Sequence, residues 1–397
     1  MRREPPAEAV TGIAVLADDL TSAGDGAAPF RRTGHRAEVL LSGAVEPDDA
    51  AAEDGVVAVD LGSRLLDEAT AGALTARFAA AFAGSDLLIK TVDSTLRGHV
   101  AAEIRAAQAG SGRRAVVVAP AFPAEGRTTV GGIQHVHGVP VHQTDFARDP
   151  AHPVRTADLA RLLPEAEVLE PERFGKLPEL IDAGGVFVCS AATDAELGLL
   201  VSSVPRPGDV LWVGSPGLAA ALAGHHSRNP ATPPPDVPGA RRPLIVVGSA
   251  HPATRRQLDR LRAREDVGAA DASAAPAEVL AALRRSSAPV LVVHTPDARR
   301  ADPGSLTGDL AVVVRESVSD GLVDGLVLTG GATAVAALEA LGAAGLELAD
   351  EPEAGVARGL LLGGPLRIPV LIKAGGFGDD GTLDRLRRLL VEGGPTR

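Results

Sequence analysis

Short apolar runs alternate along the chain with longer stretches of helix-forming residues, and most of these runs stop abruptly in polar or glycine-rich segments. Residues 86–103, DLLIKTVDSTLRGHVAAE, are the clearest case: an apolar run at 87–89 gives way to polar residues and then, after Gly98, to an amphipathic pattern. This order predicts a buried strand, a polar turn and a helix. Its repetition predicts an α/β fold.

The polar turn between this strand and this helix has the groups that bind a polyhydroxylated anion. The carboxyl ends of strands in open α/β sheets are where ligands bind, close to free N–H groups of the next helix. Arg97 can form paired hydrogen bonds with a carboxylate, Lys90 supplies a point charge, and Asp93 can accept from sugar hydroxyls beside Ser94 and Thr95. Alternatively, Asp93 or Ser94 caps the following helix and its neighbours are solvated.

Two adjacent carboxylates, Asp18 and Asp19, follow the first predicted strand at 12–17. Successive side chains of an extended strand point in opposite directions, so we predict that only Asp19 faces a ligand. It would meet a substrate hydroxyl or Mg²⁺, or it would simply cap the next helix. The strand predicted at 56–61 leads to Arg64, which places an arginine at another strand end.

Three strand-to-helix turns near the carboxyl terminus consist largely of glycine, serine and threonine, in the segments 248–252, 329–333 and 373–379. Such turns expose backbone N–H groups to phosphate oxygens with no side chain in the way. None of them fits the Walker loop or the dinucleotide fingerprint, so neither motif is predicted.

The segment 120–150 is rich in proline and glycine, and we predict a functional loop that covers the substrate. Its three histidines, His135, His137 and His142, match no structural zinc spacing and have no cysteine to assist them. Metal ligands are therefore not assigned.

A chain of 397 residues is too long for one ordinary core, so two domains are expected. The stretch 229–243 contains six prolines and no hydrophobic periodicity, which predicts a linker. It separates an amino-terminal domain at 1–228 from a carboxyl-terminal domain at 244–397.

Composition excludes several classes of protein. The start of the chain, 1–10, lacks the apolar core of a signal peptide, and no apolar run is long enough to span a membrane, so we expect a cytoplasmic protein. A net charge of −12 and 2% aromatic residues leave no basic stripe or stacking platform for nucleic acid. The single cysteine, Cys189, lies in an apolar run and is expected to be buried and inert.

Taken together, these motifs resemble the four-carbon acid sugar kinases, which phosphorylate tetronates such as threonate, erythronate or 3-oxo-tetronate with ATP. The matching segments follow the family's order over nearly the whole chain: ADDLTSAGD (17–25), SR (63–64), KTVDSTLRG (90–98), PAFPAEGRTT and GVPVHQTDFARDP (within 119–150), GSAHP (248–252), TGGAT (329–333) and KAGGFGDDGTL (373–383). The chain departs from the family at Ser22, Gly62 and Ala332, which leaves the exact tetronate open.

The resemblance implies that the amino-terminal domain binds the acid sugar and the carboxyl-terminal domain binds ATP, with the active site in the cleft between them. The implied substrate-binding residues are Asp19, Arg64, Lys90, Asp93, Ser94, Thr95 and Arg97. The implied nucleotide-binding residues are Ser249, Gly330, Gly331, Ala332, Thr333, Gly375 and Gly376.

The favoured hypothesis is therefore an ATP- and Mg²⁺-dependent kinase that acts on a terminal hydroxyl of a four-carbon sugar acid. Phosphoryl transfer needs mostly positioning and charge neutralisation. In this hypothesis Arg64 and Arg97 hold the carboxylate, Lys90 neutralises the developing charge, and Asp19 or Asp93 accepts the hydroxyl proton.

Other functions remain open alternatives. A non-catalytic protein that binds or senses a sugar acid would not need the glycine-rich turns. Residues 23–26, AGDG, are similar to the anion hole of ribokinase-like enzymes, but in those enzymes the motif opens a helix late in the chain. An NAD-dependent oxidoreductase would need the missing fingerprint. The expected partners are small molecules, and a homodimer is expected because it is the commonest soluble oligomer.

Overall fold

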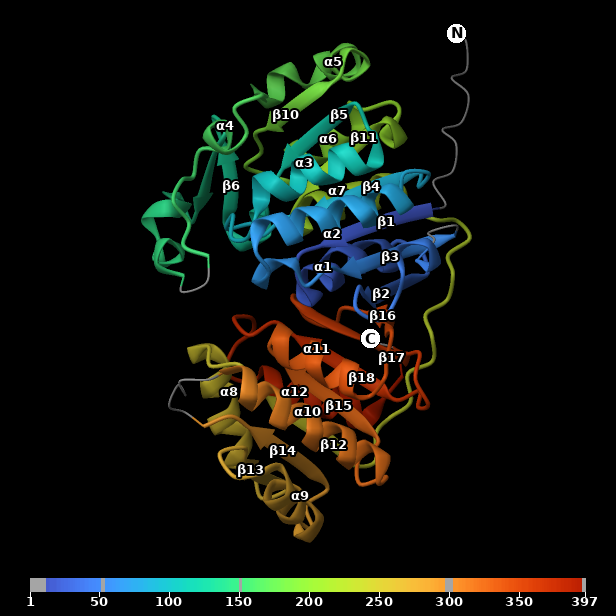
Figure 1. Ribbon diagram of the computed structural model, residues 1–397, viewed down its shortest axis with the longest axis vertical. Coiled ribbons are helices and arrows are strands. Elements are labelled where there is room, and N and C mark those ends of the chain that lie inside the picture. The colour runs from blue at the N-terminus through green and yellow to red at the C-terminus, as the bar shows by residue number, and fades with distance from the viewer. Residues whose placement is uncertain (1–11, 51–53, 150–151, 297–302, 395–397) are drawn as a thin grey trace. The chain divides into compact units, whose positions relative to one another are not determined.

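The computed structural model describes residues 12–50, 54–149, 152–296 and 303–394. These residues form two compact units (Figure 1). The second unit contains the chain from Pro234 onwards together with Glu38–Ala44, and the first unit contains the rest. The predicted absence of a signal peptide rests on residues 1–10, which lie outside the described part of the chain.

The first unit is built on a parallel sheet with the strand order β3-β1-β4-β11-β5-β10-β9. Its strands are β1 Gly12–Ala17, β3 Gly55–Asp60, β4 Leu87–Thr91, β5 Ala115–Ala119, β9 Ala166–Leu169, β10 Gly185–Cys189 and β11 Val210–Gly214. Most of these strands are buried throughout, which explains why they read as continuous apolar runs. Cys189 is buried and free, as its apolar surroundings predicted.

Helices flank this sheet, and α2 and α3 lie side by side across one face (Figure 1). The helices of the unit are α1 Leu20–Arg32, α2 Glu68–Ala81, α3 Val100–Ser111, α4 Leu159–Leu162, α5 Leu177–Ala183, α6 Asp194–Ser202 and α7 Pro216–His225. Several begin at side-chain caps, such as Asp67 before α2 and the reciprocal Thr193–Glu196 box before α6.

The segment predicted as a loop, 120–150, contains a small antiparallel sheet up to residue 149, and Pro150 lies outside the described residues. Its strands are β6 Arg127–Val130, β7 Ile133–Val136 and β8 Val139–Pro140. The glycines that suggested a loop sit at positive φ in the turns between these strands, at Gly131, Gly132 and Gly138. The segment is therefore a hairpin structure rather than an irregular loop.

The second unit has a mixed sheet in the order β13-β14-β12-β15-β18-β17-β16-β2. Parallel pairings join β13, β14, β12, β15 and β18, whereas antiparallel pairings join β18, β17, β16 and β2. The strands are β2 Ala37–Leu41, β12 Pro243–Val247, β13 Val267–Asp271, β14 Val290–His294, β15 Gly325–Thr329, β16 Gly345–Asp350, β17 Val356–Leu362 and β18 Pro369–Lys373.

Strand β2 comes early in the chain but completes the sheet of the second unit. Leu40 pairs with Gly345 and Val39 with Leu346 of β16, so the edge of β16 is covered by a strand from the amino-terminal half. The apolar run at 37–41 is typical of a strand. Its partner cannot be predicted from that run, because nothing local in a sequence tells a strand which distant edge it joins.

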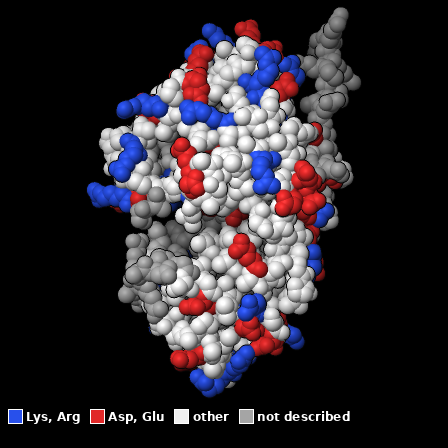
Figure 2. All heavy atoms as spheres, viewed as in Figure 1, with Lys and Arg blue, Asp and Glu red and all other residues white. Residues whose placement is uncertain are grey.

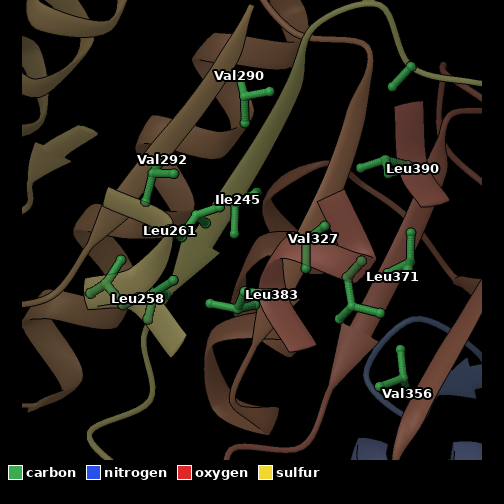
Figure 3. Packing of buried hydrophobic residues seen from close by; sticks show 13 residues of the cluster. Ile245, Leu258, Leu261, Val290, Val292, Val327, Val356, Leu371, Leu383 and Leu390 are labelled. Carbon is green, nitrogen blue, oxygen red and sulfur yellow. The ribbon is translucent and has the colours of Figure 1, made fainter. Parts of the chain in front are cut away.

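Helices pack on the second sheet in two groups. Helices α8 and α12 contact each other, and α9, α10 and α11 form the other group. Their bounds are α8 Pro252–Arg262, α9 Pro276–Arg285, α10 Pro303–Ser319, α11 Gly331–Ala340 and α12 Thr382–Glu392. In Figure 3, leucines of α8 and α12 meet Ile245, Val327 and Leu371 of the sheet in one apolar cluster. This core fixes the strand ends at which the glycine-rich turns begin.

The chain between the two units runs without helix or strand from residue 229 to 242. Its first part is held to the first unit, because the Arg31 guanidinium donates to the carbonyl oxygen of Thr232 (2.7 Å) and the Thr232 N–H donates to that of Gly34 (2.7 Å). The domain limits 1–228, 229–243 and 244–397 stay a prediction.

Acidic and basic side chains are interspersed on the face shown in Figure 2. Within the described residues, no helix is long and apolar enough to cross a membrane.

Candidate functional site

The carboxyl ends of three neighbouring strands, β3, β1 and β4, bring the predicted residues of the first unit together. Ala17 of β1 lies opposite Asp60 of β3, and Leu16 lies opposite Lys90 of β4. The chain segments that follow these strands carry the Asp18–Asp19 pair, Arg64 and the turn 92–99. Residues far apart in the sequence therefore share one edge of the sheet.

Arg64 is the centre of this group. Its Nε donates to Oδ2 of Asp18 (2.7 Å), its Nη2 donates to Oδ1 (2.8 Å), and its Nη1 forms an ion pair with Asp19. Burial by itself would raise the pKa of Asp18, but the Arg64 guanidinium outweighs burial and holds this pKa below its usual range. Arg64 thus forms ion pairs with two carboxylates, one of them buried.

The two adjacent carboxylates differ in exposure, as the alternation argument expected. Asp19 keeps 23% of its side chain exposed, whereas Asp18 keeps 3%. Asp19 also caps α1, because its Oδ1 accepts from the Ser22 N–H (2.7 Å) and the Thr21 hydroxyl (2.9 Å). Asp18 was not predicted as a site residue, although its place at the end of a buried strand was the signal that could have identified it.

Lys90 lies inside the fold rather than at its surface. Its side chain is fully buried, and Nζ contacts Glu103 Oε2 of α3 (2.8 Å) and donates to the carbonyl oxygen of Thr91 (2.7 Å). Lys90 is a residue of β4, and the buried carboxylate of Glu103 holds its ammonium group. The structure does not bring Lys90 to the open side of the turn, where the sequence suggested a direct ligand contact.

The turn after β4 is organised by Asp93, which does not cap α3. That helix begins at Val100 after His99, so the alternative that Asp93 or Ser94 is its cap is wrong. Instead, Asp93 accepts from the N–H (3.0 Å) and hydroxyl (2.9 Å) of Thr95 and forms an ion pair with Arg97.

Arg97 and Ser94 are also tied to the hairpin segment. The Arg97 guanidinium lies 5.4 Å from the ring centre of Phe146, and its Nη1 is 3.5 Å from Asp149 Oδ2. The Ser94 carbonyl oxygen accepts from Nε2 of Gln134 (2.7 Å). Arg97 nevertheless keeps 31% of its side chain exposed, against 17% for Arg64. It is the more accessible of the two predicted arginines.

Asp60 is a further carboxylate of this edge that the sequence analysis missed. It is the last residue of β3 and is 3% exposed. Burial raises the pKa of Asp60 to about 7, against the hydrogen bond from the Gly62 N–H (2.7 Å) and with help from the nearby Asp19 and Asp18. The signal that could have identified Asp60 is a single charge inside an otherwise apolar strand.

Asp60→Asn is expected to stabilise the protein at pH 8 by about 2–4 kcal/mol and to change little at pH 4. Between about pH 4 and 7 the unfolded chain releases this proton while the folded protein keeps it, so the free energy of unfolding falls as pH rises. Asparagine keeps the acceptor for Gly62 without the charge. Urea unfolding of both proteins at the two pH values measures the difference, and an equal gain at both would contradict the assigned pKa.

In the second unit, the three glycine-rich turns meet at Ser249. A Cβ atom placed on Gly375 would lie 2.4 Å from Ser249 Oγ, and one on Gly330 would lie 3.5 Å from the Ser249 nitrogen. A Cβ on Gly376 would lie 3.5 Å from Nε2 of His251. The turns after β12, β15 and β18 thus come within van der Waals distance of one another, and residues there larger than glycine would fill the space.

The turn after β15 leads directly into helix α11. Gly330 has φ of 94° and precedes Gly331, the first residue of α11. A Cβ atom on Gly331 would meet no heavy atom within 4 Å. Thr333 is buried against Gly248, and Ala332 is exposed. The first N–H groups of a helix have no partner within the helix, and a side chain on Gly331 would meet open space, so the start of α11 suits a phosphate group.

The residues described here do not form a group of three or more histidine, cysteine or acidic side chains arranged to hold a metal ion. Both Asp18 and Asp19 are engaged by Arg64, so they offer no ready pair of oxygen atoms to Mg²⁺. Carboxylates that bind Mg²⁺ commonly share it with the phosphates of a nucleotide. The protein groups alone thus do not fit a preformed magnesium site.

Comparison with known proteins matches both units. Residues 13–222 match the model of a sugar-binding N-terminal domain, and residues 244–383 match that of a nucleotide-binding C-terminal domain. A D-threonate kinase of Bordetella bronchiseptica is 36% identical over 96% of this chain and 98% of its own length. The chain belongs to the four-carbon acid sugar kinase family.

Other members of the four-carbon acid sugar kinase family differ in the substrate that their names give. A D-erythronate kinase of Heliobacterium modesticaldum is 30% identical over 93% of this chain and 95% of its own. A 3-oxo-tetronate kinase of Methylobacterium radiotolerans is 28% identical over 92% of this chain and 96% of its own. A solved structure from Salmonella typhimurium LT2 shares the fold, with a TM-score of 0.80 and 18% identity over 95% of this chain and 98% of its own.

These findings confirm the family, the two-domain α/β fold and the class of ATP-dependent sugar-acid kinases predicted from the sequence. The nucleotide-binding domain implies ATP as the cofactor. The roles of individual residues stay predictions.

Proposed function

We propose that this protein transfers the γ-phosphoryl group of ATP to a terminal hydroxyl of a four-carbon sugar acid, a tetronate or 3-oxo-tetronate. The observation that carries the proposal is that one chain holds both halves of the required chemistry. Arginine and aspartate side chains share one strand edge of the first unit, and three glycine-rich turns meet in the second. Mg²⁺ would enter bound to the phosphates of ATP.

Arg97 is our candidate for binding the substrate carboxylate. Arg64 already places its guanidinium on Asp18 and Asp19, whereas Arg97 keeps about a third of its side chain exposed. A planar guanidinium can donate two parallel N–H groups to a carboxylate. Arg64 would then set the position and charge of the aspartates around the substrate hydroxyls.

The proton acceptor is one of the carboxylates near this arginine pair. Burial would raise the pKa of Asp93, but Arg97 and Arg64 hold it below its usual range, which weakens Asp93 as a base near neutral pH. Asp19 is the more exposed sequence-predicted candidate. Asp60, with a pKa of about 7, is the candidate that the structure adds.

Arg97→Lys is expected to lower kcat/KM for the sugar acid about ten- to a hundredfold while leaving the affinity for ATP unchanged. An ammonium keeps the charge but cannot reproduce the paired donors of the guanidinium. Steady-state kinetics with the melting temperature measured alongside separates this effect from instability. A variant that melts early yet turns over normally would show that Arg97 only holds Asp93.

The kinase proposal is tested by measuring ADP release with a panel of four-carbon acids: both threonate enantiomers, both erythronate enantiomers and the 3-oxo acids. Turnover with at least one of them supports the proposal. Binding of sugar acid without ADP release from any member would favour the alternative, a non-catalytic sensing protein. A cytoplasmic location and a homodimer are part of the proposal, the latter because homodimers are the commonest soluble oligomers.

A further inference from the structure

Lys373 is a buried cation at the end of β18, beside the glycine-rich turns. Its side chain is fully buried. The chain has only three lysines among its 39 lysine and arginine residues. Nζ donates to the Thr254 hydroxyl (3.2 Å) and to the carbonyl oxygen of Ala374 (2.9 Å). These partners are neutral, so the charge is hydrogen-bonded but not balanced.

Lys90 is a buried lysine of the same fold whose charge is balanced by a carboxylate. Both lysines lie near the carboxyl end of a strand that has neighbours on both sides, and both are fully buried. Lys90 has Glu103 at 2.8 Å, whereas no carboxylate among the described residues forms an ion pair with Lys373. The acid whose charge acts on Lys373 is Glu353, and its carboxylate is engaged by Arg385.

An unbalanced buried charge is costly, because the interior does not solvate an ammonium group as water does. Burial lowers the pKa of Lys373 to about 8, with only Glu353 acting in the opposite direction. A buried ammonium group at this position suits a site that binds an anion, because the bound anion would balance its charge.

Hydrogen bonds connect Lys373 to the turn on which phosphate is proposed to bind. The Thr254 hydroxyl accepts from Lys373 and donates to the carbonyl oxygen of Gly375 (2.7 Å). Gly375 lies against Ser249, where the three turns meet. On the neighbouring strand, opposite Lys373, the buried hydroxyl of Thr329 has no hydrogen-bond partner. Polar groups at these strand ends therefore remain unsatisfied by the protein.

We propose that Lys373 is a positioning residue for the nucleotide phosphates: it holds the Gly375 turn through Thr254 and supplies the buried positive charge that a polyphosphate balances. This inference rests on the proposed kinase function and names the part of the second unit that recognises phosphate. It gives Lys373 no contact with the adenosine half of the nucleotide.

The test compares ADP with adenosine, using calorimetry on the full chain. Lys373→Met keeps the length of the side chain but removes its charge. It is expected to weaken ADP binding about tenfold or more and to leave adenosine binding within about twofold. Lys176→Met, at an exposed lysine of the first unit, is the matched control and should bind both ligands as the unmodified protein does.

A second measurement needs no variant. ADP affinity of the unmodified protein should fall as pH rises from about 7.5 to 9.5, because Lys373 loses its proton in this range. The other charged groups that act on it are Glu353 and His251. Burial lowers the pKa of His251 below 6.5, so His251 does not titrate in this window. Lys373→Met should lose the pH dependence.

Equal weakening of ADP and adenosine in Lys373→Met would overturn the inference, since that pattern indicates a structural role. Unchanged ADP affinity in the variant, or an ADP affinity of the unmodified protein that does not vary with pH, would also overturn it. In each of these cases, turnover by the unmodified protein would leave the kinase proposal standing. Absence of both ADP binding and turnover in the unmodified protein would instead refute the proposed function.

Discussion

Gly331→Val is expected to reduce nucleotide affinity about a hundredfold or more while the protein stays folded. Gly331 is the first residue of α11, where free N–H groups can reach phosphate oxygens. A Cβ atom there meets no protein atom within 4 Å, so a branched side chain would extend into the space proposed for phosphate rather than into the core. The sugar-acid site of the first unit should be unaffected.

The matched control for this variant is Gly308→Val. Gly308 is also helical and in the second unit, and a Cβ atom on it likewise meets nothing within 4 Å; Gly308 is exposed, whereas Gly331 is half-buried. Calorimetric titration with ATP should show normal binding by the control and binding weaker by about a hundredfold or more by Gly331→Val. If both variants bind ATP as the unmodified protein does, the turn after β15 does not bind the nucleotide.

Arg64→Met is expected to lower the free energy of unfolding by about 3–5 kcal/mol and to abolish turnover. The substitution leaves Asp18 buried with a charge that no longer has a partner, and it releases Asp19 as well. The loss should be smaller at acid pH, because Arg64 is what keeps the pKa of Asp18 low and the carboxyl can protonate once the arginine is gone.

The double variant Asp18→Asn with Arg64→Met shows how much of the lost stability comes from the unpaired charge of Asp18 and how much from the packing of the Arg64 side chain. Removing the buried carboxylate together with its partner should restore most of the stability lost in Arg64→Met, as measured by urea unfolding at pH 7.5. Turnover should stay lost, because the arrangement around Asp19 still lacks its arginine. A double variant no more stable than Arg64→Met alone would show that the ion pair with Asp18 is not the main contribution.

Local patterns predicted the strands well because most of them are buried on both faces. The strands predicted at 12–17, 56–61 and 87–89 all correspond to strands of the first unit. The membership of β2 in the second sheet was not predicted. Pairing between β2 and β16 joins residues about 300 apart, and no periodicity records such a distant partner.

The grouping of the candidate residues was predicted, but their contacts were not, for the same reason. The polar residues that follow the strands lie together within each unit, since parallel strands place their carboxyl ends together. The sequence pattern did not show that Lys90 points to a buried Glu103, or that Arg64 is shared by two aspartates. Those facts depend on how helices and neighbouring strands pack, which a single strand end does not encode.

The most direct test of the account follows the phosphoryl group itself. The protein is incubated with Mg²⁺ and ATP labelled in its γ-phosphate, together with each four-carbon sugar acid of the panel in turn, and the products are separated and identified by mass spectrometry. We predict that the label appears on the sugar acid as a phosphate monoester in amounts equal to the ADP formed. Label recovered only as inorganic phosphate, or only as unchanged ATP for every acid of the panel, would contradict the account.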